Sequence, residues 1–280
     1  PLRNFQNADS KDRAFSIWTD AGIPCPRHWV IETDPDDPED LACVDQVLAL
    51  RDAESRILLR TNNESAYQGL HVIDGDASPD RIRSVVRDLK AHAARLRPIR
   101  RDTKLLGVKY IDTRGPEGYA TLSRAFVVLD RVFCYYALVS KRDFFRAGDM
   151  VPDVYERWLA ANRQLRAMIE APEVASLFVQ AVATLGNNIG AVDFLVRDGA
   201  PVLLEMNPLW GQISFGNREL ADRITATRAS WSEDLPNIAE FLDYVPFYGR
   251  MYEYIADYAD RNPGAWIPPN TQPSGTRRVS

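Results

Sequence analysis

Apolar residues recur at helical spacing in several separate segments of the chain. The clearest case follows Pro79, where Ile82, Val85, Val86 and Leu89 fall on one face of a helix. The same reading predicts further helices over residues 10–22, 152–170 and 173–186, and in the aromatic-rich stretch after residue 232.

An acidic run from Asp34 to Asp40 precedes another predicted helix. The run lacks the alternating ligands and the central glycine of a calcium loop. We interpret it as a turn whose carboxylates suit a helix N-terminus. The helix that follows is expected to direct Leu41, Val44, Val47 and Leu48 toward a core.

Short apolar segments bounded by turn residues predict strands. They cover residues 29–31, 57–60, 70–73, 105–111, 122–129, 132–139, 191–196 and 201–206. These strands are intermixed with helices without a regular βαβ alternation. The pattern therefore predicts an α+β protein with antiparallel sheets.

The last two predicted strands form a hairpin that carries polar residues inside apolar runs. Asp193 interrupts the first strand, and Glu205 and Asn207 interrupt the end of the second. With a three-residue loop at 198–200, Asp193 lies directly opposite Glu205. With a two-residue loop, Glu205 points to the other face unless the hairpin contains a bulge.

Two carboxylates opposite each other destabilise a sheet unless something lies between them. Mg²⁺ accepts carboxylate and amide oxygens, so Asp193, Glu205 and Asn207 predict a site for Mg²⁺ or Mn²⁺. The alternative is a solvated sheet face. The apolar residues on both faces of the hairpin favour a buried sheet instead.

Composition narrows the function classes. The net charge of −5 and the sequence pI of about 5.4 argue against nucleic acid or an anionic membrane as a partner. No apolar run is long enough for a membrane span. The scattered Cys25, Cys43 and Cys134 are typical of reduced thiols in a cytoplasmic protein, and the histidines lack the spacing of a zinc site.

The hairpin resembles the metal-binding end of the ATP-grasp superfamily, in which an aspartate in one strand precedes Glu-x-Asn at the end of the next. The resemblance implies two α+β subdomains with antiparallel sheets that enclose a nucleotide cleft. We expect these subdomains at residues 1–110 and 111–232, with the metal site in the second. Residues 233–280 are expected to form a helical extension and a proline-rich tail.

The resemblance also implies residues that bind ATP. Arg60 ends a strand at which the family places a phosphate-contacting cation, and its structural alternative is a pair with a nearby acid. The loop 61–69 lies where the family has a glycine-rich flap, and it includes Gln68 and Gly69. Because Gly69 is its only glycine, polar side chains must do more of the work, and an ordinary surface loop is the alternative.

The strand after residue 105 resembles the hinge that reads adenine. By this resemblance Lys109 lies near the base and the α-phosphate, and Tyr110 and Ile111 supply backbone contacts. Asp112 and Glu117 are the candidates for binding the ribose hydroxyls. Without the resemblance, this segment would be interpreted only as a core strand.

Basic residues of the next two strands are the catalytic candidates. Arg124 is a charge inside an apolar run and resembles the family arginine directed at the γ-phosphate or the acyl-phosphate. A solvated edge residue is the alternative. Among the basic residues Lys141, Arg142 and Arg146, we choose Arg142 to bind the transferred phosphate or a substrate carboxylate.

The function that the resemblance implies is an ADP-forming carboxylate-amine ligase. A substrate carboxylate takes the γ-phosphate of ATP, and an amine then displaces phosphate. The expected partners are therefore a small-molecule carboxylate and an amine. A kinase that phosphorylates a hydroxyl and a nucleotide-binding module without chemistry are the two alternatives.

The resemblance covers roughly residues 4–216. Family members usually begin with a Rossmann-like domain, and here we expect it to be absent or to be supplied by a partner. The aromatics of 217–280 are expected either to cover a sheet edge or to mediate a homodimer.

Overall fold

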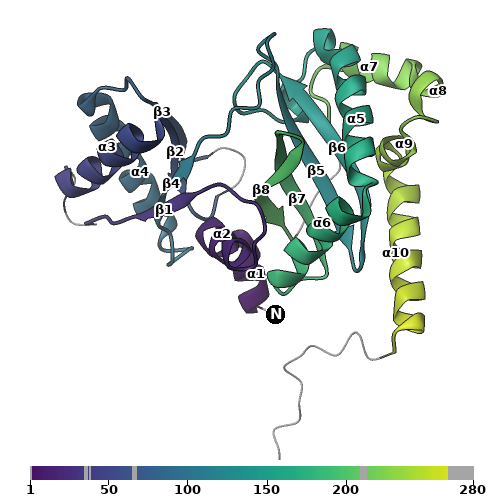
Figure 1. Cartoon of the computed structure of the whole chain (residues 1–280), viewed down its shortest axis with the longest axis horizontal. Helices are drawn as coiled ribbons and strands as arrows, with labels where there is room; N and C mark the ends of the chain where they lie inside the picture. The colour runs from purple at the N-terminus through teal and green to yellow at the C-terminus, as the bar shows by residue number, and fades with distance from the viewer. Residues whose placement is uncertain (1, 35–36, 38, 65–67, 209–212, 264–280) are drawn as a thin grey trace, which may run out of the picture.

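Two four-stranded antiparallel sheets, each covered by helices, organise the protein (Figure 1). The mixture of helices and antiparallel sheets confirms the α+β class predicted from the sequence. This computed structural model describes residues 2–34, 37, 39–64, 68–208 and 213–263.

The first sheet has the strand order β1-β4-β2-β3. Helices α3 and α4 pack against it. The bounds are β1 His28–Ile31, α3 Leu41–Glu54, β2 Arg56–Thr61, β3 Leu70–Asp74, α4 Pro79–Leu96 and β4 Leu105–Lys109.

Most of the apolar residues that were predicted to face the core from α3 and α4 are buried. The four apolar residues predicted for α4 are buried, as are Val44 and Val47 of α3. Leu41, however, is 55% exposed, so the prediction that it faces the core is wrong. It is the first residue of α3, where the N-cap Asp40 folds back and accepts a hydrogen bond from the Cys43 N–H at 3.1 Å.

The second sheet has the strand order β6-β5-β7-β8. Helices α5 and α6 pack on it, and two short 3₁₀ turns precede α5. The bounds are β5 Ala120–Val128, β6 Arg131–Ser140, 3₁₀ turns Ala147–Asp149 and Pro152–Val154, α5 Tyr155–Ile169, α6 Pro172–Thr184, β7 Ile189–Arg197 and β8 Ala200–Asn207.

Two N-terminal helices precede the first strand: α1 (Leu2–Asp9) contacts β8 of the second sheet, and α2 (Lys11–Asp20) contacts both β1 of the first sheet and β8 of the second. The predicted helix after Ser10 is confirmed as α2, whereas α1 was not predicted. Tertiary contacts hold α1: Asn4 donates from Nδ2 to the Gly186 carbonyl at 2.5 Å. The proposed boundary between subdomains at residue 110 stays a prediction.

The C-terminal helices cover one end of the second sheet. Phe241 of α9 stacks on Tyr136 of β6 with 5.6 Å between ring centroids. Asn237 donates from Nδ2 to the backbone carbonyl of Tyr135 at 2.8 Å, so α9 satisfies part of the edge strand β6. A homodimer through this region stays a prediction, and residues 264–280 of the expected tail lie outside the described residues. The helices are α7 Arg218–Ala226, α8 Arg228–Trp231, α9 Pro236–Leu242 and α10 Tyr244–Arg261.

The hairpin of β7 and β8 combines a short turn with a bulge. Arg197 pairs with Ala200, so the loop has the two residues Asp198 and Gly199, both with positive φ (53° and 79°). The register then shifts by one residue between Phe194 and Asp193. The bulge that a two-residue loop requires is therefore present.

Candidate active site

A row of polar side chains crosses the second sheet. The strand register places Tyr136 opposite Arg124, Arg124 opposite Asp193, and Asp193 opposite Glu205. Directly opposite residues of an antiparallel pair share a face. The extra residue Leu204 in the bulge is what brings Glu205 onto the face of Asp193.

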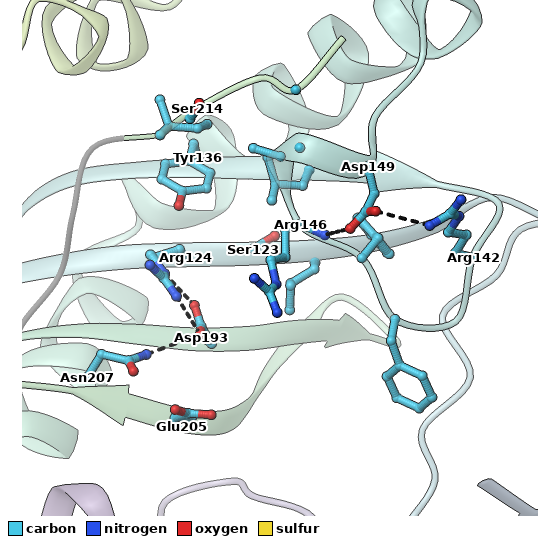
Figure 2. A pocket seen from close by; sticks show the side chains of 18 of the residues that line it. Ser123, Arg124, Tyr136, Arg142, Arg146, Asp149, Asp193, Glu205, Asn207 and Ser214 are labelled. Carbon is cyan, nitrogen blue, oxygen red and sulfur yellow. Dashed lines mark hydrogen bonds and ion pairs between the residues drawn. The ribbon is translucent and has the colours of Figure 1, made fainter. Parts of the chain in front are cut away.

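Arg124 and Asp193 form a bidentate ion pair, visible in Figure 2. The arginine donates from Nε and Nη2 to the two carboxylate oxygens at 2.5 and 2.7 Å. Burial raises the pKa of the Asp193 carboxyl, Arg124 opposes this rise, and the charge of Glu205 adds to it. Burial therefore disfavours the charged form of Asp193, and a nearby cation is needed to favour it.

Asn207 completes the polar set on β8. Its Nδ2 donates to Asp193 Oδ2 at 3.2 Å, so this hydrogen bond does not use the amide oxygen Oδ1. Figure 2 shows Asp193, Glu205 and Asn207 together on β7 and β8. The three predicted metal ligands are thus adjacent in space.

Lys11, at the start of α2, is the cationic partner of Glu205. Its Nζ lies 3.3 Å from Glu205 Oε2 and donates to the Glu64 carbonyl oxygen at 2.7 Å. Burial lowers the pKa of Lys11 to about 8, although the charge of Glu205 acts in the opposite direction. Arg60 donates from Nη2 to the same Glu64 carbonyl at 2.8 Å, so two cationic groups meet at one backbone oxygen.

A cavity of about 990 Å³ opens over this polar row. Arg142 donates from Nη1 to Asp149 Oδ1 at 3.0 Å, and the Arg146 backbone N–H donates to Asp149 Oδ2 at 2.9 Å (Figure 2). The charged and amide side chains that line the cavity are Arg60, Arg124, Arg142, Arg146, Asp149, Asp193, Glu205 and Asn207. The surplus of arginines suits a ligand with several anionic oxygens.

A second, smaller cavity of about 130 Å³ adjoins the first. The predicted hinge residues Lys109, Tyr110 and Ile111 line it, together with apolar side chains of both sheets. The two cavities share Arg60, Leu122, Phe144, Asp193 and Glu205. An apolar slot beside strand-end backbone groups thus leads directly into an arginine-lined chamber.

Four residues predicted for the nucleotide lie outside the lining of both cavities, namely Gln68, Gly69, Asp112 and Glu117. Gln68 is exposed. Asp112 accepts two hydrogen bonds from the Arg114 side chain, which lowers its pKa to about 2. Glu117 is paired with Arg157 at the surface. Their binding roles stay predictions.

The loop 61–69 is anchored inside the protein where the structure describes it. Asn62 and Asn63 are buried and donate to Asp12 Oδ1 and Thr103 Oγ1 at 3.0 and 3.1 Å. Gly69, which does not line either cavity, has φ +57°, and an added Cβ would lie 2.7 Å from Glu64 Oε2. Residues 65–67, which include Ser65 of the predicted flap, lie outside the described residues.

Three features of the site were missed in the sequence. They are the pairing of Lys11 with Glu205, the pairing of Asp149 with Arg142, and the place of Tyr136 in the polar row. Lys11 has the pattern of an ordinary first-turn residue, and Tyr136 that of a core aromatic. Only the tertiary register brings them to the site.

The polar row fits a divalent cation by its donor chemistry. Two opposed carboxylates and one amide oxygen are hard ligands of the kind that Mg²⁺ accepts, with water and phosphate completing its shell. Within the described part of the chain, no group of three or more His, Cys, Asp or Glu side chains is arranged to hold a metal.

Comparison with known proteins finds structural likeness only. No protein-family model and no curated protein matches the chain. The D-alanine-D-alanine ligase from Coxiella burnetii is 10% identical, with a TM-score of 0.48, and the match covers 93% of this chain and 64% of that one. The ATP-grasp ligase PsnB complexed with minimal precursor is 18% identical, with a TM-score of 0.46 and coverage of 80% and 62%.

A third structure, the L-amino acid ligase from Bacillus licheniformis, is 17% identical, with a TM-score of 0.48 and coverage of 75% and 45%. The chain therefore spans less than two thirds of the length of each of these proteins. It is similar in structure to ligases, one of which is named an ATP-grasp ligase. None of the helices described is long and apolar enough to cross a membrane.

Proposed function

We propose that this chain is an ATP-dependent ligase that activates a substrate carboxylate for attack by an amine. The observation that carries the proposal is the row Arg124, Asp193 and Glu205, which lies where an apolar slot meets an arginine-lined cavity. The two joined cavities have the hinge backbone at one end, the proposed metal ligands in the middle and arginines at the other end. This arrangement suits Mg-ATP and an anionic substrate.

The residues that would hold the nucleotide follow from their places. Lys109, Tyr110 and Ile111 line the slot where adenine would lie, and Arg60 stands at the junction of the two cavities. Asp193, Glu205 and Asn207 would hold Mg²⁺ at the phosphates. The bound Mg-ATP would supply the γ-phosphoryl group for the substrate carboxylate.

The side chains of the site bind and neutralise charge rather than transfer protons. Arg124 is a half-buried cation and Lys11 a buried one, both beside the proposed metal ligands, and they would stabilise phosphoryl oxygens during transfer. Arg142 and Arg146 would hold the carboxylate side of the substrate. An acyl-phosphate formed there loses phosphate when the amine nitrogen attacks its carbonyl carbon and gives up a proton.

The direct test is ADP release from Mg-ATP in the presence of amino acids and other small carboxylates, with and without amines. Hydroxylamine is included to trap an acyl-phosphate as a hydroxamate. We expect ADP and hydroxamate only when a carboxylate is present. The matched variant Asp193→Asn should release little ADP while remaining folded.

Other outcomes separate the alternatives. ADP release that depends on a hydroxyl substrate, without hydroxamate, would show a kinase. Tight ATP binding without ADP release for any pair would show a nucleotide-binding module. Either result would overturn the ligase proposal.

A further inference from the structure

Asp143 connects the two sheets beside the cavities. It lies in the segment that follows β6, yet its donors come from residues far away in the sequence. Tyr110 donates from Oη to Asp143 Oδ1 at 2.9 Å, and Arg56 donates from Nη2 to Asp143 Oδ2 at 3.2 Å. Arg114 adds an ion pair from Nη1 to Oδ1 at 3.3 Å. We call these four residues the Asp143 cluster.

Two donors of the cluster, Arg56 and Tyr110, are held at the first sheet. Arg56 is the first residue of β2, and its Nε lies 2.7 Å from Asp74 Oδ1 on β3. Its guanidinium lies over the Tyr110 ring, 4.0 Å from the centroid. The Tyr110 N–H donates to the Arg56 carbonyl at 3.3 Å. Arg56 and Tyr110 are therefore held in place by contacts with each other and with β3.

The residues on either side of Asp143 face the site. Arg142 lines the large cavity, and Phe144 lines both cavities. Consecutive residues share their backbone, so fixing the Asp143 carboxylate restricts where Arg142 and Phe144 can lie. Arg142 itself is 69% exposed in its side chain, and its partner Asp149 belongs to the same segment. Asp143 therefore connects this segment to the first sheet by hydrogen bonds and an ion pair.

Both cationic and anionic side chains lie near the Asp143 carboxylate. Arg56 and Arg114 face it from the first sheet and from the linker, and each of them also holds a second carboxylate, Asp74 or Asp112. The neutral Tyr110 hydroxyl is thus the contact that joins Asp143 to the hinge itself. Tyr110 also lines the slot proposed for adenine.

We infer that Asp143 is a positioning residue that couples occupation of the hinge slot to the placement of Arg142 and Phe144. This inference rests on the proposed function. A nucleotide that orders Tyr110 makes the hydrogen bond to Asp143 more persistent, and the segment 141–149 is then held ready for the acceptor substrate. By linkage, ordering of the segment raises the affinity for the nucleotide by the same factor by which the nucleotide favours the ordered segment.

The test compares Asp143→Asn, Tyr110→Phe and the conservative Asp143→Glu with a control, Asp234→Asn. The control alters an exposed ion pair between Arg163 of α5 and Asp234, which lies between α8 and α9. Hydrogen exchange of the segment 141–149 is measured first, with no ligand and then with Mg-AMP-PNP. We expect Asp143→Asn to exchange at least about threefold faster there, and Asp234→Asn to match the parent. The nucleotide should slow exchange of this segment in the parent and much less in Tyr110→Phe.

Turnover then gives a second measurement. The kcat for ADP release should fall about tenfold in Asp143→Asn, with a smaller change in the KM for ATP, and Asp143→Glu should recover part of kcat. Unchanged exchange in both Asp143→Asn and Tyr110→Phe would overturn the inference, whether or not the parent releases ADP. A parent without ADP release but with the expected exchange pattern would overturn the ligase proposal alone. Circular dichroism identifies a variant that has failed to fold, and Tyr110→Phe, which removes one hydroxyl, then decides the result.

Discussion

Arg124 and Asp193 lie directly opposite each other on β5 and β7, and the guanidinium donates to both carboxylate oxygens. Glu205 faces the same carboxylate from the strand on its other side. Asp193 therefore lies between a cation and an anion in the middle of a sheet. This relationship gives Arg124 a structural role as well as the catalytic role proposed for it.

Replacing Arg124 with methionine should leave Asp193 without its compensating cation. Among the described residues Arg124 is the one ion-pair partner of Asp193, and a poorly solvated carboxylate that loses such a partner destabilises the protein. The cost is expected to be roughly 2–4 kcal/mol, which is moderate because the pair is partly accessible at its edge. Urea denaturation measures this change in the free energy of unfolding.

The double variant Arg124→Met with Asp193→Asn provides the control. It removes the lone charge, so it should be more stable than Arg124→Met alone. Arg163→Met, which breaks the exposed pair with Asp234, should cost less than about 1 kcal/mol. Equal costs for Arg124→Met and Arg163→Met would contradict the account.

Lys11 should make the free energy of unfolding change with pH in the alkaline range. Its pKa is about 8 in the folded protein, because burial disfavours the charged form, against an ordinary value of 10.5. Between these values the unfolded chain holds a proton that the folded protein has released, so stability rises with pH in this window. The rise due to Lys11 is up to about 3 kcal/mol.

The measurement is the difference in unfolding free energy between the parent and Lys11→Met from pH 7 to pH 11. The parent should gain stability relative to the variant between about pH 8 and 10.5. A constant difference across this range would show that Lys11 titrates at its ordinary pKa.

The hairpin shows how far the sequence determines the site. The alternation of apolar and polar residues indicates that Asp193 and Glu205 belong to paired strands. The Asp198-Gly199 turn favours a two-residue loop, which by itself would place them on opposite faces. The chemistry of two carboxylates and an amide required a bulge, and the bulge at Leu204 is present. Pattern and chemistry together therefore predicted that Asp193 and Glu205 lie opposite each other, and the structure shows this arrangement.

Other parts depend on contacts that no local pattern carries. Helix α1 is short and mostly polar, and bonds such as that from Asn4 to Gly186 hold it. Asn62 belongs to a loop whose composition suits a phosphate flap, but its amide is used to bind Asp12 and Lys104. The buried position of Lys11 follows from the meeting of three distant segments. Such positions are fixed only when the sheets are assembled.

Gly216 and Gly148 form a tight backbone contact at the rim of the large cavity. A Cβ added to Gly216 would lie 2.5 Å from the Gly148 carbonyl oxygen, whereas one added to Gly148 would lie 3.9 Å from the Gly216 nitrogen. Gly216→Ala should therefore cost about 1–3 kcal/mol and raise the KM of the acceptor substrate, because the two backbones must separate. Gly148→Ala is the matched control and should be close to neutral. Thermal unfolding and ADP release would measure both, and a larger cost for Gly148→Ala would refute the contact.

The central claim is that Asp193, Glu205 and Asn207 hold Mg²⁺ at the phosphates of ATP. Titration calorimetry of AMP-PNP binding, with and without Mg²⁺, tests it in the parent, in Glu205→Gln and in Glu219→Gln, an exposed glutamate of α7. We predict that Mg²⁺ strengthens binding in the parent and in Glu219→Gln, and that Glu205→Gln loses about tenfold or more of this gain. Equal Mg²⁺-dependent binding in folded Glu205→Gln and in the parent would contradict the claim.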